Sequence, residues 1–190
     1  MRSASPASRT RGSRRPLHNP AQHGASLNPA LEEVSFCPRC GRDAQVDFPQ
    51  RIHCPHCGYG AYYNPKPVSG AIPSDADGNL VLLRRAFDPG AGLWTFPGGF
   101  VDLGESVEDA ARREVREELE IDVELGELVG VYSRSDERVV LIVFAATALG
   151  EPRTTEEATE VAAFPPDALP WDELAFWSTQ AALRDVLRNP

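Results

Sequence analysis

The sequence has no apolar run approaching the roughly 18 residues that a membrane-spanning helix needs. Its N-terminus also lacks the apolar stretch of a secretory signal peptide. We therefore expect a cytoplasmic protein with no membrane association. Cysteine is scarce, because all four cysteines lie between Cys37 and Cys57. In an intracellular protein such a cluster indicates a metal site, and a disulfide or redox pair is the less favoured interpretation.

Acidic residues are absent from residues 1–31, which contain five arginines and are rich in serine, proline and alanine. This segment has no hydrophobic periodicity, so we expect a disordered basic tail. A transit peptide and an over-extended start site are the alternative interpretations. Since the formal net charge of the whole chain is −9, residues 32–190 carry −14. That acidic body makes nucleic-acid binding an unfavoured function and suits a site that gathers divalent cations.

The cysteines form two near-copies of one short pattern, Cys37-Pro38-Arg39-Cys40-Gly41 and Cys54-Pro55-His56-Cys57-Gly58. Two Cys-x2-Cys pairs separated by thirteen residues predict a tetrahedral zinc site, in which each glycine allows the tight turn. Four thiolates leave no open position, so the zinc is expected to be structural and His53 and His56 to be solvated neighbours. We therefore predict a zinc ribbon over residues 32–63.

The remaining residues, 64–190, are predicted to form one domain that begins with the extended linker Asn64-Pro65-Lys66-Pro67. Hydrophobic spacing predicts a helix from about Ser106 to Leu119 and another from about Trp171 or Asp172 to Leu187. Strands and helices alternate, which indicates an α/β or α+β class with a mixed sheet. The predicted strands are Val68–Ile72, Leu80–Leu83, Trp94–Phe96, Val123–Tyr132 and Val139–Ala148, with a hairpin turn at Asp77-Gly78.

Three carboxylates, Glu114, Glu117 and Glu118, fall at helical spacing that places them on one face of the first helix. A solvated acidic face is the ordinary interpretation of such a triplet. The tight turn Pro97-Gly98-Gly99 upstream and the neighbouring Arg113 favour a functional one. Clustered carboxylate oxygens suit Mg²⁺ or Mn²⁺, which leave coordination positions for water and substrate phosphates.

The segment from Gly99 to Ile121 resembles the Nudix box. The resemblance rests on Gly99, Glu105, the run Arg113-Glu114-Val115, Glu117-Glu118 and Ile121, all at the spacing of that motif. It implies the Nudix α/β/α sandwich and metal-assisted hydrolysis of a phosphoanhydride. Glu120 departs from the motif, which has glycine there, and is expected to cost up to about 1 kcal/mol or to end the helix differently.

The resemblance also implies a role for each matching residue. Glu114, Glu117 and Glu118 would bind the divalent metal, and one of the last two would accept the proton of the attacking water. Arg113 would orient Glu114, Glu105 would stabilise the loop-helix-loop and reach the metal through water, and Gly99 would hold the turn. A further ligand or base is expected from a later polar loop, whose candidates are Glu156, Glu157 and Glu160, with Glu157 and Glu160 favoured.

A zinc ribbon before a Nudix domain resembles the NADH pyrophosphatase branch and related smaller hydrolases, some of which are dimers, over about Phe36 to Leu187. The Ser-Gln-Pro-Trp-Pro-Phe-Pro type motif of NADH pyrophosphatases is absent, and Tyr132–Arg138 stands in its place. We therefore expect ADP-ribose or a similar nucleotide sugar as substrate. An NAD(H) pyrophosphatase and a catalytically silent ligand sensor are the alternatives, and a homodimer is a further expectation.

Arginines that contact the diphosphate and aromatic rings that stack on the base would complete the site. The same residues could equally form surface ion pairs and core packing. The candidates are Arg84, Arg85, Tyr63, Phe87 and Trp94.

Overall fold

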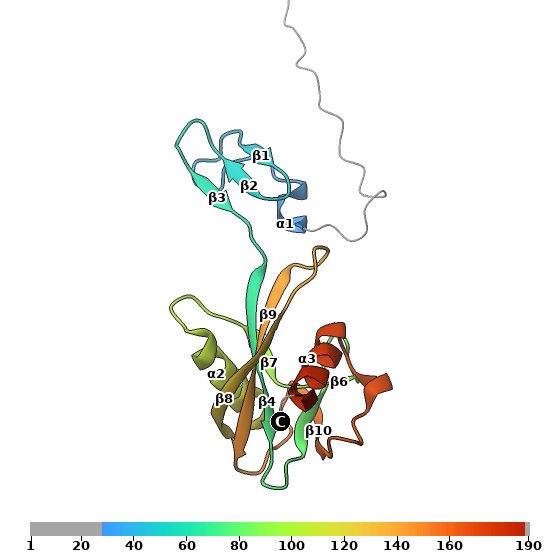
Figure 1. The fold of residues 1–190 in the computed structure, drawn as a ribbon. Coiled ribbons are helices and arrows are strands. Elements are labelled where there is room, and N and C mark those ends of the chain that lie inside the picture. The colour runs from blue at the N-terminus through green and yellow to red at the C-terminus, as the bar shows by residue number, and fades with distance from the viewer. Residues whose placement is uncertain (1–27, 189–190) are drawn as a thin grey trace, which may run out of the picture.

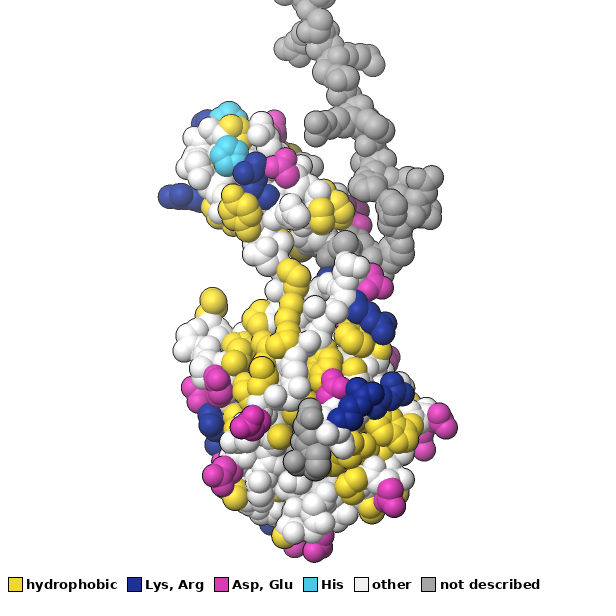
Figure 2. Space-filling view, in the orientation of Figure 1, with side chains coloured by type: hydrophobic (Ala, Val, Ile, Leu, Met, Phe, Trp, Pro, Cys, Tyr) yellow, Lys and Arg dark blue, Asp and Glu magenta, His cyan; other side chains and the backbone are white. Residues whose placement is uncertain are grey.

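The structure is a computed structural model that describes residues 28–188. A small ribbon is followed by a larger domain, and a narrow neck joins them (Figures 1 and 2). Most of the tail predicted for residues 1–31 lies outside the described residues. Its last part is helix α1, Pro29–Glu32, in which Leu31 is buried. The Asn28 side-chain amide donates to the carbonyl of Pro49 at 2.6 Å, so this end of the predicted tail contacts the ribbon.

The ribbon is a three-stranded antiparallel sheet in the order β1-β2-β3. Its strands are β1, Gln45–Asp47, β2, Arg51–His53, and β3, Gly60–Tyr62. The repeated cysteine pattern gives a repeated turn, since Gly41 N–H donates to the Cys37 carbonyl and Gly58 N–H donates to the Cys54 carbonyl. Both glycines have left-handed backbone, with φ of 70° and 71°, a conformation that a side chain would disfavour.

The larger domain is built on a seven-stranded mixed sheet in the order β10-β5-β4-β9-β8, with β6 paired to β5 and β7 paired to β4. The β4–β9 pair is parallel, and the other pairs are antiparallel. The strands are β4, Lys66–Ser74, β5, Leu80–Arg85, β6, Trp94–Thr95, β7, Gly98–Phe100, β8, Asp122–Tyr132, β9, Val139–Leu149, and β10, Ala158–Phe164.

Helix α2, Val107–Leu119, and helix α3, Trp177–Arg188, cover opposite faces of this sheet (Figure 1). Successive strand residues point to opposite faces, so each helix packs on its own core. Ala71 of β4 joins the core under α2, whereas its neighbour Ile72 joins the core under α3. The α/β/α sandwich with a mixed sheet is therefore confirmed. Among the described residues, no helix is long and apolar enough to cross a membrane.

The last helix starts later than predicted. Trp171–Glu173 forms a separate 3-10 turn, η2, and Leu174 is extended and bridges to Trp94. Helix α3 begins only at Trp177. The sequence analysis also missed β7, because its two glycines have low strand propensity, and β10, whose acidic start resembles a loop.

Helix α2 begins and ends with distinct caps. The Ser106 hydroxyl accepts the backbone N–H of Asp109 at 3.1 Å, as N-cap residues do. At the other end Glu120 has φ 55° and ψ 29°, and its N–H donates to the Arg116 carbonyl. Glu120 thus adopts the left-handed C-cap conformation that glycine favours, so the helix ends as it would with the usual residue.

Replacing Glu120 with glycine should therefore stabilise the domain. We expect Glu120→Gly to raise the free energy of unfolding by about 1 kcal/mol, because glycine removes the contact between Cβ and the carbonyl in this conformation. Denaturant unfolding followed by circular dichroism measures the change. Glu120→Ala keeps Cβ and serves as the control, so equal stabilisation by both variants would contradict the explanation.

Candidate active site

The site lies where β7 pairs with the first half of β4 and faces helix α2. Gly98 pairs with Gly70, and a Cβ on Gly98 would lie 2.8 Å from the Gly70 Cα. A Cβ on Gly99 would lie 2.3 Å from Oε1 of Glu114. The Gly98 N–H donates to Oε2 of Glu118 at 2.9 Å. Two carboxylates of α2 are thus held against glycine backbone that has no room for a side chain.

Burial makes these two carboxylates unusual. Glu114 is 9% exposed and Glu118 is 5% exposed, whereas Glu117 is exposed. Burial raises the pKa of Glu114, although its bond to Arg113 opposes the rise. Burial also raises the pKa of Glu118 to about 7, against the opposing effect of the Gly98 N–H. A cation beside these groups would favour their ionised forms.

Arg113 joins the helix to the preceding loop with all five of its N–H donors. Its Nε donates to Glu105 Oε1 at 2.9 Å, and Nη2 donates to Glu105 Oε2 at 3.1 Å and to the Phe100 carbonyl at 2.9 Å. Its Nη1 donates to Glu114 at 2.7 Å and to Glu117 at 2.9 Å. The bond to Arg113 lowers the pKa of Glu105, and the carboxylates raise the pKa of Arg113 further.

A cleft of about 860 Å³ lies over this network. Its walls come from β4, β7, α2, the loop after β8 and the first turn of α3. The polar and aromatic residues that line the cleft are Arg85, Thr95, Phe96, Phe100, Asp102, Arg113, Glu114, Glu117, Glu118, Asp136, Glu137, Arg138, Glu157, Phe176, Trp177, Ser178 and Thr179. Gly99, Arg113 and the three helix glutamates therefore line a space within the range of about 300–1,000 Å³ that small-molecule sites occupy, whereas Glu105 does not line it.

The three post-box glutamates take different places. Glu157 lines the cleft, where its charge contributes to the raised pKa of both Glu114 and Glu118. Glu160 instead accepts Nε of Arg84 at 2.9 Å and does not line the cleft. Glu156 is exposed and also lies away from it. The structure brings only Glu157 of these three to the candidate site. Glu160 lies in the edge strand β10, where it pairs with Arg84 instead.

Among the five predicted substrate contacts, only Arg85 lines the cleft. Arg84 forms ion pairs with Glu160 and Glu173, and its guanidinium lies 4.5 Å from the centre of the Trp94 ring. Trp94 is 3% exposed and belongs to the core under α3. Tyr63 follows the ribbon and Phe87 is exposed, and neither lines the cleft. Arg84 is therefore ion-paired and Trp94 is packed in the core, and the structure does not bring either of them to the cleft.

Sequence analysis missed the wall opposite α2. Neither Phe176 nor Trp177 was a candidate site residue, and residues 136–138 were used only to exclude a family motif. Nothing in the local sequence indicated that the loop after β8 lies beside this helix end.

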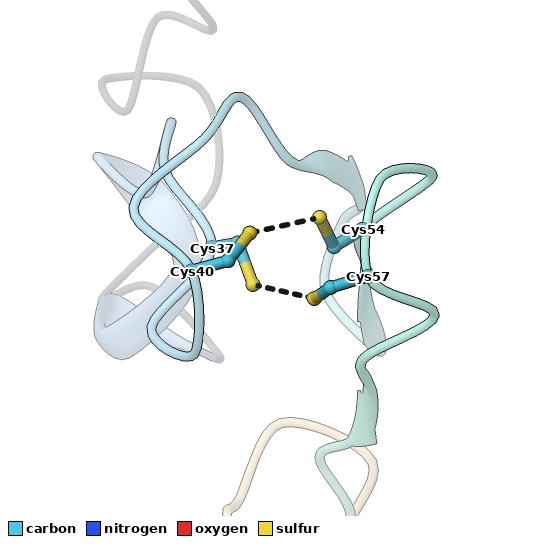
Figure 3. Close-up of side chains that lie close together, drawn as sticks. All are labelled: Cys37, Cys40, Cys54 and Cys57. Carbon is cyan, nitrogen blue, oxygen red and sulfur yellow. Dashed lines mark hydrogen bonds between the residues drawn. The ribbon is translucent and has the colours of Figure 1, made fainter.

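The four cysteines converge, as Figure 3 shows. All four sulfur atoms lie within 4.8 Å of one another, with Sγ–Sγ distances of 3.7 Å for Cys37–Cys57 and 3.6 Å for Cys40–Cys54. A tetrahedron with Zn–S bonds of about 2.3 Å has edges of about 3.8 Å, whereas a disulfide needs about 2.05 Å. Cys54 is buried, which disfavours its thiolate, but the N–H groups of Cys57 and His56 outweigh this and lower its pKa to about 6. This donor set fits a closed zinc site.

The oxygen donors of the cleft fit a different ion. In residues 28–188, the four cysteines are the only group of three or more His, Cys, Asp or Glu residues that could hold an ion as they lie. In the cleft, Arg113 bonds Glu114 and Glu117, and the Gly98 N–H bonds Glu118. Carboxylates around open space suit Mg²⁺ or Mn²⁺, which keep several waters and use only a few protein ligands.

Comparisons with known proteins agree with this geometry. The NUDIX domain family matches residues 64–187. The chain is 35% identical over 136 residues to an ADP-ribose pyrophosphatase of Methanocaldococcus jannaschii, a match that covers 68% of the chain and 78% of that protein. It is also 35% identical over 104 residues to the NAD-capped RNA hydrolase NudC of Haemophilus influenzae, covering 53% of the chain and only 39% of that longer protein.

A solved structure extends the likeness to the ribbon. The crystal structure of a NUDIX hydrolase from Nitrosomonas europaea superposes with a TM-score of 0.75 and 32% sequence identity. The superposition covers 82% of this chain, more than residues 64–190 make up, and 92% of the other. The fold and the carboxylates of α2 that pack on glycine backbone agree with these matches. The chain therefore belongs to the Nudix family and is a Nudix hydrolase.

Proposed function

We propose that the protein cleaves the phosphoanhydride of ADP-ribose or a similar nucleotide sugar in a divalent-metal-dependent reaction. One observation carries the proposal: Glu114 and Glu118 are buried acids that line an open cleft. Arg113 pairs with Glu114, whereas Glu118 forms no salt bridge among the described residues, although the nearby charge of Arg85 opposes the rise of its pKa. Buried carboxylates are otherwise paired or bound to metal. The intact carboxylate set favours an enzyme over a silent sensor.

Each residue of the network has a distinct role in this proposal. Glu114, Glu117 and Glu118 would hold Mg²⁺ or Mn²⁺. When bound, that ion would neutralise charge on the diphosphate and acidify a water molecule. Arg113 orients Glu114 and Glu117, and Glu105 orients Arg113 in turn through two hydrogen bonds.

A base and a phosphate-binding cation would complete the chemistry. Glu157 at the cleft wall is the base candidate favoured by position, beside Glu117 or Glu118 from the helix itself. The Arg85 guanidinium lines the same cleft and has no carboxylate partner among the ion pairs of the described residues, so it is available for a phosphate. In this proposal, cationic and anionic groups would line one substrate path.

The substrate proposal rests on two observations. The M. jannaschii relative, which the chain matches over most of both lengths, is named an ADP-ribose pyrophosphatase. Tyr132–Arg138 departs from the motif of NADH pyrophosphatases, and this loop lines the cleft. The name of the NudC relative keeps NAD-type substrates as the second candidate.

Conversion of the helix carboxylates to amides should stop turnover. We expect Glu117→Gln and Glu118→Gln each to lower kcat/KM by about 100-fold or more, since a lost metal ligand costs several kcal/mol of transition-state stabilisation. Release of AMP from ADP-ribose, other nucleotide sugars and NADH with Mg²⁺ or Mn²⁺ measures this. Glu108→Gln, an exposed glutamate of the same helix, is the control. Near-normal activity in both test variants would refute the metal-site assignment.

Adding one methyl group at Gly99 should have a similar effect. The new Cβ would collide with the Glu114 carboxylate at 2.3 Å, so we expect Gly99→Ala to displace that carboxylate and lower kcat/KM by about 10-fold or more. Gly60→Ala is the control, because the nearest atom to its Cβ would be 3.9 Å away. If Gly99→Ala turns over ADP-ribose as fast as the control does, close packing of Glu114 on Gly99 is irrelevant to catalysis.

We further propose that the four cysteines bind one structural zinc ion. Metal analysis of the purified protein should give about one zinc per chain, and Cys54→Ser should remove it because three thiolates bind far more weakly than four. His56→Ala should retain the zinc, since the sulfur cluster is complete without histidine. A zinc-free wild-type protein, or equal loss from both variants, would contradict a four-cysteine site.

A further inference from the structure

Trp177 lies where a ligand in the cleft would meet it. It is the first residue of α3, it is partly buried against the core under that helix, and it lines the cleft beside Phe176 and Ser178. The other two tryptophans are elsewhere: Trp94 is 3% exposed in the core, and Trp171 in η2 does not line the cleft. The cleft thus has a single tryptophan in its wall.

One loop fixes the orientation of this indole. The Nε1–H of Trp177 donates to the carboxylate of Glu137, and the Arg134 guanidinium lies 4.0 Å from the ring centre. Both partners come from the segment between β8 and β9, far from α3 in the sequence. An in-plane hydrogen bond and a cation over the ring together restrict the ring more than either would alone. A ring held in this way loses little freedom when a ligand binds.

The rest of the wall suits the non-reacting part of a nucleotide. Phe176 precedes Trp177, and the Arg85 guanidinium lies 5.3 Å from the centre of the Phe176 ring. Arg85 and Phe176 line the same cleft as Glu114 and Glu118. A ligand whose phosphates lie at the carboxylates would therefore extend along Arg85 towards two aromatic side chains.

We propose that Trp177 is the stacking platform for the aromatic base of the substrate and that Arg134 and Glu137 are its positioning residues. This inference rests on the proposed function, because it names the part of the nucleotide that the cleft recognises. Stacking on an indole needs a planar π-system, which a base supplies and a sugar phosphate does not. The platform therefore favours phosphoanhydrides that carry a nucleoside over those that do not, and it discriminates only weakly among bases.

Tryptophan fluorescence tests the platform without any need for turnover. AMP should quench the full-length protein saturably, whereas ribose 5-phosphate, which lacks the base, should not. Trp177→Phe should abolish the quenching, and Trp171→Phe should keep it. Trp171 is a matched control because it also lies under an arginine, with Arg184 5.4 Å from its ring centre. Quenching that survives in Trp177→Phe, equal quenching by ribose 5-phosphate, or no quenching of the wild type would overturn the proposal.

Kinetics test Trp177 and its positioning residue Glu137. Trp177→Ala should raise KM for ADP-ribose about 10-fold, with the loss falling mainly on KM, while Trp171→Ala should leave KM unchanged. Glu137→Gln keeps an oxygen that can accept the indole N–H, so it should retain most of the affinity, whereas Glu137→Leu should raise KM as Trp177→Ala does. Equal KM values for Glu137→Gln and Glu137→Leu would refute the positioning role.

The two proposals fail in different ways. Saturable AMP quenching without hydrolysis of any nucleotide sugar would leave the platform in place and overturn the proposed reaction. Hydrolysis of ADP-ribose with quenching that does not depend on Trp177 would keep the reaction and overturn the platform.

Discussion

The hydrogen bonds of Arg113 are the interaction on which the site depends. Its five N–H donors reach three carboxylates and one backbone carbonyl, so one guanidinium ties the loop after β7 to the middle of α2. Without a cation at this place, the acidic side chains of one helical turn would repel each other. Lysine could not replace it, because an ammonium group has three donors and lacks the planar fork. The arginine therefore orients the carboxylates and offsets part of their charge.

Close backbone approach is the second constraint. The mixed sheet pairs β7 with β4. In this pair the backbone of Gly70 leaves no space for a Cβ on Gly98. The carboxylate of Glu114 occupies the space that a side chain on Gly99 would fill. The N–H of Gly98 donates to the carboxylate of Glu118. Two acids become buried because glycine allows them to approach the strand. The packing of the sheet thereby determines how the helix presents its ligands to the cleft.

The ribbon and the larger domain contain donor sets of opposite character. The ribbon offers four sulfur atoms at tetrahedral separations, a soft and closed set that fits zinc as a structural ion. The cleft offers carboxylate oxygens beside open space, a hard and incomplete set that leaves positions for water and phosphate. The difference in geometry follows from the local structure. Two turns bring the four cysteines together, whereas the helix only places the glutamates on one face.

The sequence by itself determined the parts of this protein that depend on local spacing. These are the two cysteine turns, the carboxylate face of α2, the Ser106 cap and most strands of the sheet, because 3.6-residue and two-residue periodicities can be read from the chain. Only the tertiary structure decided that Glu157 reaches the cleft while Glu160 pairs with Arg84. It also decided that Trp177 meets the loop after β8. Those contacts join segments far apart in the chain, and their geometry follows from strand order and packing, which no local pattern encodes.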